Sequence, residues 1–179
     1  MSHRPESRSA IIRELVQADA PAYRELMLLG LEQHAESFRI SLRDEGEPMI
    51  PFVRTREGAF TLGAWLTGDT LAGTVSFERD MREKFRHKGL LYRMYVRDDA
   101  SGMGIGNMLI RETIARARKM EGLERINLTV IASNSRAKRL YASGGFVSFS
   151  LERKGLKMGE SYYDEEQMTL SLHESGLQP

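Results

Sequence analysis

The sequence of 179 residues predicts a mixed α/β (α+β) domain, in which a largely antiparallel central sheet of about six to seven strands is flanked by about four helices. Two observations predict this class. Three strand-like segments precede the first strand–helix–strand unit, which favours antiparallel pairing. Two later segments carry apolar residues at helical spacing. The length suits one domain, which we expect over residues 1–179, with residues 1–9 disordered or extended.

The first strand is predicted at Ile11–Ile12. Asp19 precedes Ala20–Pro21 and is predicted to cap a helix, because aspartate accepts hydrogen bonds from open amides and proline is tolerated in the first turn. Leucines at helical spacing continue this segment to Phe38 as one or two helices. Residues 42–56 hold two prolines and charges of both signs, which predicts an exposed loop.

A different pattern begins near residue 58. Two strands are predicted over residues 58–66 and 71–79, and the turn residues 67–70 between them indicate a hairpin. A basic run over residues 82–88 follows. It leads into a strong predicted strand over residues 89–97.

The remaining chain alternates between helix and strand. Apolar and small residues fall on one side of a predicted helix that begins at Gly106 and ends before Gly122. A short strand is predicted over residues 126–132, and a shorter helix over residues 135–143 is stopped by two glycines. Residues 146–155 and 162–172 are then predicted to form a final pair of strands.

Composition excludes several classes of protein. The net charge of +1 argues against a duplex-DNA binder, whose affinity depends on neutralising many phosphates. The sequence contains no cysteine, which excludes disulfides, thiolate metal sites and cysteine nucleophiles. Its four histidines lack metal-ligand spacing, so no metal site is predicted. Because no signal peptide or membrane-spanning segment is evident, we expect a cytoplasmic protein.

A glycine-rich loop at residues 98–106 is the most informative segment. Gly102, Gly104 and Gly106 stand where a helix opens, so that successive N–H groups and the helix N-terminus can bind an anion. The Rossmann fingerprint needs the spacing G-x-G-x-x-G, whereas this loop has G-x-G-x-G. A phosphate-binding P-loop needs a lysine where Asn107 stands. A plain glycine-rich turn is the third interpretation.

A second pattern, N-x-x-A-x-x-L-Y-x-x-x-G-F, follows at the right separation. Its members are Asn134, Ala137, Leu140, Tyr141, Gly145 and Phe146. Together with MYV and GMGIG upstream, it resembles the GNAT superfamily of N-acetyltransferases, most densely over residues 90–146. The resemblance implies the GNAT fold, a single acyl-CoA N-acyltransferase-like domain, and acetyl-CoA as the cosubstrate.

The resemblance also implies roles for individual residues. The loop from Ser101 to Asn107 would wrap the pyrophosphate of acetyl-CoA, although the family usually has arginine or glutamine where Ser101 stands. The backbone of residues 94–96 would pair with pantetheine, which Asn134 would also bind. The implied cofactor-binding residues are Met94, Tyr95, Val96, Ser101, Gly102, Met103, Gly104, Ile105, Gly106, Asn107, Asn134, Ala137 and Tyr141.

Tyr141 would act as the general acid that protonates the departing thiolate, since a phenol can donate a proton to sulfur. A core aromatic is the other interpretation of this residue. Arg136, Lys138 and Arg139 are cations that could meet the cofactor's 3′-phosphate, or simply a solvated surface.

The general base is not indicated by any motif. Related enzymes often place a glutamate on the strand before the phosphate loop, yet the segment LLYRMYV has none. Glu78, at the end of the preceding strand, is the first candidate base. The other candidates are Asp80, Asp164, Glu165, Glu32, Glu36 and, as a minor one, His34, while Trp65, Tyr95, Phe52 and Phe60 are candidates for the acceptor pocket.

The sequence therefore predicts an N-acetyltransferase that moves the acetyl group of acetyl-CoA to a primary amine by direct nucleophilic attack. A small-molecule acceptor is favoured, with no nucleic-acid or membrane partner, and similar proteins suggest a homodimer. Two alternatives stay open: a CoA-binding sensory or degenerate module without useful catalysis, and a protein or peptide amine acetyltransferase.

Overall fold

The computed structural model of the protein describes residues 10–41 and 57–173. The predictions for residues 1–9 and 42–56 lie outside these ranges. The strands are β1 (Ile11–Glu14), β2 (Ala59–Leu66), β3 (Thr70–Arg79), β4 (Lys88–Val96), β5 (Arg125–Ile131), β6 (Val147–Met158) and β7 (Ser161–Ser171). The α-helices are α1 (Ala20–Gln33), α2 (Ile105–Ala117) and α3 (Ser135–Ser143). Four 3-10 helices are η1 (Gln17–Asp19), η2 (Ala35–Ser37), η3 (Glu83–Phe85) and η4 (Asp98–Ala100).

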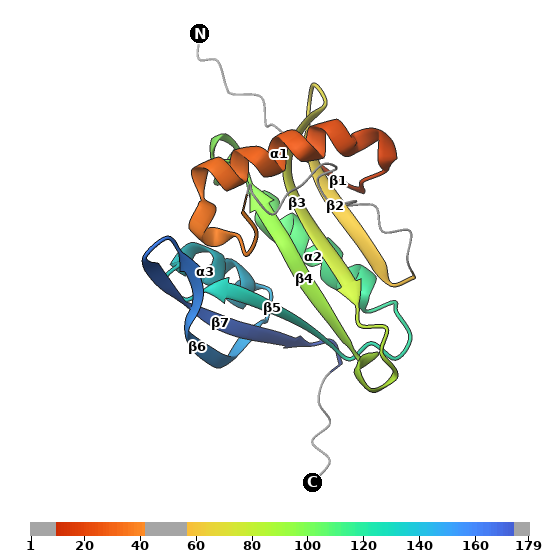
Figure 1. Ribbon diagram of the computed structural model, residues 1–179. Coiled ribbons are helices and arrows are strands. Elements are labelled where there is room, and N and C mark those ends of the chain that lie inside the picture. Colours follow the sequence, from red (N-terminus) through yellow and green to blue (C-terminus); the bar gives the residue numbers. More distant parts are fainter. Residues whose placement is uncertain (1–9, 42–56, 174–179) are drawn as a thin grey trace.

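All seven strands belong to one sheet, in the order β1-β2-β3-β4-β5-β7-β6 (Figure 1). The pairing of β4 with β5 is parallel, and the other five pairings are antiparallel. The predicted mixed α/β class with a largely antiparallel sheet is therefore confirmed. Among the described residues, the segment after α1 forms only the single turn η2, so the flanking elements are three α-helices and short 3-10 turns.

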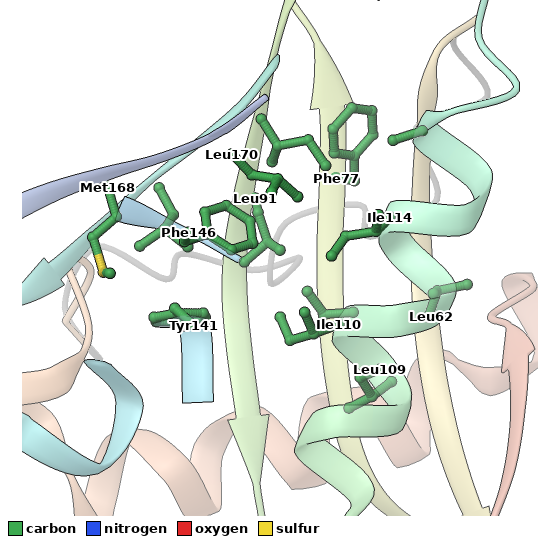
Figure 2. Close-up of a cluster of buried hydrophobic side chains, with 14 of the residues drawn as sticks. Leu62, Phe77, Leu91, Leu109, Ile110, Ile114, Tyr141, Phe146, Met168 and Leu170 are labelled. Carbon is green, nitrogen blue, oxygen red and sulfur yellow. The ribbon is translucent and has the colours of Figure 1, made fainter. Parts of the chain in front are cut away.

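Helices cover both faces of the sheet, with α1 crossing one face and α2 lying on the other (Figure 1). The larger core fills the space between the sheet and helices α2 and α3, and includes Leu62, Phe77, Ile110 and Phe146 (Figure 2). The smaller core lies under α1 and includes Tyr95 of β4. Because strand side chains alternate between faces, β4 contributes to both cores.

The start of α1 differs in one detail from its prediction. Asp19 precedes the helix, but its carboxylate does not cap it. It instead accepts hydrogen bonds from the Val16 amide (2.8 Å) and from the Arg13 guanidinium (2.7 and 2.8 Å). The bonds from Arg13 are the main reason that the pKa of Asp19 lies below its usual value. The carboxylate therefore ties β1 to the turn η1.

The feature that positions the candidate site is the separation of β4 from β5. The two strands pair only over Lys88–Leu90 of β4, which lie beside residues 125–127 of β5. A bulge follows at Arg93, whose φ is +52°, and the register of β4 against β3 shifts there. Bulges bend a strand and increase its twist. From this point β4 and β5 diverge, as Figure 1 shows, and β5 stays paired with β7 along its length.

None of the helices in residues 10–41 and 57–173 has both the length and the apolar composition that a membrane span requires.

Candidate active site

A cavity of about 620 Å³ lies where the ends of β4 and β5 have separated. Its walls come from the end of α1 with η2, the end of β4, the glycine loop with the start of α2, and α3 with the end of β5. Its volume is within the range of about 300–1,000 Å³ that is usual for small-molecule sites. Every predicted cofactor-binding residue except Met103 lines it.

The glycine loop forms the wall that suits an anion. Gly102 and Gly104 have φ values of +82° and +76°, and a Cβ at either position would meet no atom within 4 Å. These two glycines are therefore needed for backbone conformation rather than for space. Gly106 differs, because a Cβ there would lie 3.0 Å from Leu140 Cδ2. The lack of a side chain at Gly106 therefore lets α2 lie close to α3.

The N-terminus of α2 begins at this loop without a side-chain cap. The first intrahelical hydrogen bond near the loop runs from the Met108 amide to the Gly104 carbonyl, at 3.0 Å. The amides of Ile105, Gly106 and Asn107 precede that bond in the first turn, where helices leave their N–H groups unpaired. Unpaired amides at the positive end of a helix dipole form an anion site.

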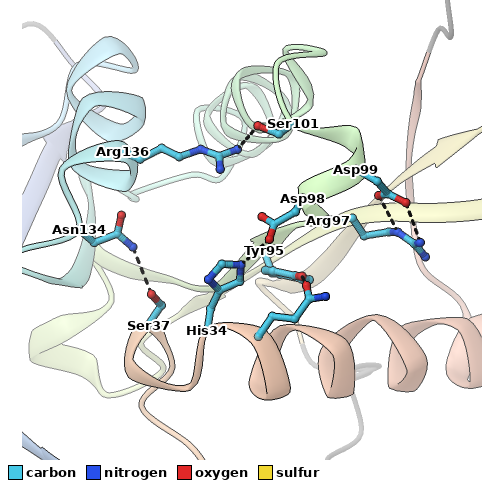
Figure 3. A network of polar contacts seen from close by, with 10 residues as sticks. His34, Ser37, Tyr95, Arg97, Asp98, Asp99, Ser101, Asn134 and Arg136 are labelled. Carbon is cyan, nitrogen blue, oxygen red and sulfur yellow. Dashed lines mark hydrogen bonds and ion pairs between the residues drawn. The ribbon is translucent and has the colours of Figure 1, made fainter.

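A cation stands beside this anion site. The Arg136 guanidinium, from α3, donates a hydrogen bond of 2.6 Å to Ser101 Oγ in the loop (Figure 3). Here the serine side chain is short, and the positive charge reaches the loop from the neighbouring helix.

The end of β4 forms a second wall. Met94, Tyr95 and Val96 line the cavity, and in the described sheet their edge toward β5 has no strand partner. The Tyr95 hydroxyl donates a hydrogen bond of 3.2 Å to Gln33 Oε1, and its ring lies 5.8 Å from that of Phe38. Burial raises the pKa of Tyr95 above its usual value, with Asp98 adding to the effect. The free β4 edge could therefore pair with an extended chain that carries amide groups.

Asn134 lies on the opposite side of the cavity, at the start of α3. Its Oδ1 accepts the Ala137 amide at 3.0 Å, which caps the helix. Its Nδ2 donates to Ser37 Oγ at 3.3 Å, from η2 across the cavity (Figure 3). The amide group thus has a partner at each end, and a ligand that bound Nδ2 would replace Ser37.

Tyr141 is a core aromatic, as one of the two interpretations of the sequence has it, and it also borders the cavity. Its ring is only 7% exposed and packs edge-on against Phe146 at 6.0 Å, within the larger core (Figure 2). Burial raises its pKa well above the usual value, so its hydroxyl remains protonated at any ordinary working pH.

Glu78, the first candidate base, is not at this cavity. It lies opposite Leu90, six residues before Val96 on β4, which corresponds to about 20 Å of strand. It lines a different pocket, together with Asp80. Asp80 is half-buried, and Arg82 lowers its pKa to about 2, chiefly through a side-chain hydrogen bond.

Some of the other candidate bases line the cavity and some do not. Glu36 and His34 line the cavity, and His34 Nε2 lies 3.0 Å from Asp98 Oδ2 (Figure 3). Glu165 is buried beside Arg39, and Glu32 is exposed. Asp164 lies 3.7 Å from Arg153 in an ion pair.

The aromatic residues proposed for an acceptor pocket are also divided. Tyr95 lines the cavity, whereas Phe60 packs in the larger core and Trp65 lies under Arg13, whose guanidinium carbon is 4.4 Å from the ring centre. Phe52 falls outside the described residues. Within the described ranges, no group of three or more metal-ligating side chains is present.

The sequence did not indicate Ser37, Phe38, Asp98 and Ile131 as site residues, although all four line the cavity. Asp98 meets His34 across 64 positions of the chain, and Ser37 meets Asn134 across 97. Contacts between such distant positions leave no local pattern that could have indicated them.

Comparison with known proteins identifies a matching family and similar solved structures. The model of the acetyltransferase (GNAT) family matches residues 13–146. A GNAT-family acetyltransferase from Streptococcus pneumoniae is 25% identical, with a TM-score of 0.77 over 91% of this chain and 99% of that one. A ribosomal-protein-alanine N-acetyltransferase from Brucella melitensis is 24% identical, with a TM-score of 0.73 over 90% and 99% of the two chains. A phosphinothricin acetyltransferase from Sinorhizobium meliloti, in complex with acetyl-CoA, is 17% identical, with a TM-score of 0.77 over 96% and 92%. The search of curated proteins finds no match.

Proposed function

We propose that this chain, which belongs to the acetyltransferase (GNAT) family, transfers the acetyl group of acetyl-CoA to a primary amine. One observation carries the proposal: a single cavity joins an uncapped helix N-terminus, an unpaired strand edge and a buried tyrosine. Those three parts match the pyrophosphate, the pantetheine arm and the departing thiol of acetyl-CoA.

The residues present fit this cosubstrate. The amides of residues 102–107 would receive the pyrophosphate, with Arg136 beside them. The free edge of Met94–Val96 would pair with the two amides of pantetheine, and Asn134 would bind the same arm from across the cavity. When bound, acetyl-CoA supplies an activated thioester.

The chemistry required of the chain is then limited. The amine nitrogen forms a bond with the acetyl carbon, and the carbon–sulfur bond breaks. Tyr141 donates a proton to the sulfur as it leaves. Because the chain has no cysteine, transfer through an enzyme thiol is excluded, which supports direct attack.

Ligand-dependent unfolding tests the cofactor site. Acetyl-CoA or CoA at about 100 times its dissociation constant should add about 2.7 kcal/mol to the free energy of unfolding. For a domain of this size the midpoint should rise by about 5–11 °C. NADH is the control and should cause no shift. The absence of a shift with both forms of CoA would contradict the proposal.

Acceptor specificity is tested by release of CoA thiol from acetyl-CoA. Primary amines and short peptides with a free amino terminus should be compared in the same assay, since the solved relatives include an enzyme named for phosphinothricin and one named for a ribosomal-protein alanine. Release with an amine but not a peptide supports the small-molecule acceptor. Tight CoA binding with no release from any acceptor supports the sensory alternative.

Arg136 gives a separate prediction. Arg136→Ala should weaken acetyl-CoA binding about tenfold, because it removes a charge-assisted interaction from a partly exposed phosphate site. The matched control is Arg139→Ala, an exposed arginine of the same helix that does not line the cavity. Isothermal calorimetry measures both affinities.

Dephospho-CoA, which lacks the 3′-phosphate, identifies the group that Arg136 contacts. A tenfold loss that persists with dephospho-CoA supports contact with the pyrophosphate. A loss that disappears with dephospho-CoA would assign Arg136 to the 3′-phosphate, and an equal loss in Arg139→Ala would contradict a specific role.

A further inference from the structure

The acetyl-transfer reaction leaves one requirement unmet, which is a group that takes a proton from the acceptor amine. Most primary amines are ammonium ions near neutral pH and cannot attack until one proton is removed. β4, the usual source of this base in relatives, carries no carboxylate, and Glu78 lies at the other end of the strand pair.

Glu165 on β7 has properties that no structural role explains fully. The residue is 1% exposed, which makes it the most deeply buried charged group of the described residues. Arg39 faces it, with Nε 2.9 Å from Oε1 and Nη2 donating to Oε2 at 3.3 Å. The Nε contact is not aligned as a hydrogen bond, and Oε1 accepts none from the described residues.

This arrangement is energetically poor for a purely structural ion pair. A buried carboxylate is costly unless charged partners and aligned donors compensate for its lost hydration. The Arg39 side chain is 64% exposed, so it is largely hydrated while its partner is not. Buried polar atoms without a hydrogen-bond partner are rare in native proteins, and a catalytic role is one reason for which they are retained.

The strand register places Glu165 next to the cavity. Glu165 lies directly opposite Ile131, and paired residues of antiparallel strands have their side chains on the same face. Ile131 lines the cavity, as do Ser37 and Phe38, which immediately precede Arg39. The carboxylate therefore lies behind the cavity wall at the end of β5, with Arg39 as the side chain that covers it.

Glu166, the next residue of β7, has a charged partner on the opposite face of the sheet. Glu166 points to the other face of the sheet, where its Oε2 pairs with Lys138 Nζ of α3 at 2.6 Å. Space near Glu165 is also preserved, because a Cβ at Gly155 of β6 would come within 3.0 Å of Glu165 Oε2.

From these observations, and on the basis of the function proposed above, we infer that Glu165 binds the ammonium group of the acceptor and acts as its general base. The ammonium takes the place that Arg39 occupies, so the acceptor is a cationic primary amine. One proton passes from nitrogen to the Glu165 carboxylate and then to solvent. The nitrogen–carbon bond forms as the carbon–sulfur bond breaks, and the second proton lost by nitrogen balances the one that sulfur receives through Tyr141.

Three variants separate this role from a structural one. Glu165→Gln should lower kcat/KM for the best acceptor of an amine panel at least 100-fold, with acetyl-CoA affinity changed less than twofold. Arg39→Gln breaks the same ion pair but keeps the carboxylate, so it should lose less than tenfold. Glu166→Gln is the matched control and should retain native activity.

Amines of different basicity distinguish a general base from a structural residue. Loss of a structural residue should lower activity equally with a basic and a non-basic amine. A counterpart of the best amine that carries three fluorine atoms on its β-carbon is mostly neutral near neutral pH and needs no base to lose its first proton. The loss in Glu165→Gln should therefore shrink at least tenfold with the fluorinated amine. Equal losses in Glu165→Gln and Arg39→Gln, or the same loss with both amines, would overturn the inference.

Amine binding measured without turnover keeps this test independent of the proposed function. Calorimetry with CoA-loaded protein and 1-aminobutane, 1,4-diaminobutane and glycinamide should show binding in the native chain that weakens at least tenfold in Glu165→Gln. A native chain that binds amines through Glu165 but releases no thiol from acetyl-CoA would contradict acetyl transfer only. Binding that is absent, or indifferent to Glu165→Gln, would overturn the inference about Glu165.

Discussion

Replacement of Tyr141 by phenylalanine is expected to lower kcat about 100-fold or more while the dissociation constant for acetyl-CoA changes less than twofold. Loss of a positioned general acid typically costs a factor of about 10²–10⁴. The ring packs against Phe146 and the larger core, and phenylalanine preserves that packing. Only the hydroxyl group is removed, so the free energy of unfolding should change little.

The matched control is Tyr95→Phe, the same change at the other tyrosine of the cavity. Its hydroxyl already donates a hydrogen bond to Gln33 of α1, so kcat should fall less than tenfold. A stopped assay of amide product and calorimetry with acetyl-CoA measure the two quantities. Equal, small effects of the two substitutions would remove Tyr141 from the mechanism.

The pH dependence of the native chain follows from the same burial. A general acid must be protonated to act, and burial raises the pKa of Tyr141 above its ordinary value of 10.0. Rate should therefore not decline through Tyr141 ionisation anywhere below pH 10. A decline near neutral pH that vanished in Tyr141→Phe would contradict this assignment.

Local patterns were sufficient to predict the fold and one wall of the site. Alternating strands, the hairpin turn at residues 67–70 and two helices ending near glycine are all short-range signals, and the described structure contains each of them. The glycine loop is also local: Gly102 and Gly104 have the positive φ values that only glycine adopts easily.

The contacts that hold the walls of the site together could not be predicted, because they join distant positions of the chain and depend on one unusual backbone angle. Arg39 meets Glu165 across 126 positions, and Arg136 meets Ser101 across 35. The bulge that separates β4 from β5 is centred on Arg93 at φ +52°, and arginine does not indicate such a conformation.

The interpretation of Glu78 illustrates a different limit. It was the first candidate base because it is a carboxylate at the end of the strand that precedes β4. In an antiparallel pair, however, the end of one strand lies beside the start of the next. Glu78 is consequently opposite Leu90, where β4 and β5 are still paired, and the open end of the two strands is distant.

The prediction with the largest effect on stability concerns the core beneath the end of β4 that is paired with β5. Phe77→Ala should lower the free energy of unfolding by about 3–5 kcal/mol, because the ring is fully buried and stacks on Phe60 at 5.2 Å. The unfolding midpoint should fall by roughly 6–20 °C. Phe85→Ala, an exposed phenylalanine nearby, is the control and should change stability by about 0.5 kcal/mol or less.

Gly89 shows why this ring matters for the site. It lies on β4 within the short parallel pairing, and a Cβ there would overlap the Cζ and Cε2 atoms of Phe77. Gly89→Ala alone should therefore destabilise the chain by about 1–3 kcal/mol through overpacking. In the Phe77→Ala background the new methyl group enters vacated space, so the two costs should fall short of additivity by about 1 kcal/mol or more. Denaturant titration of the four proteins measures this coupling. Additive costs would mean that the ring and the strand pairing are independent, and that the divergence of β4 and β5 begins without support from the core beneath it.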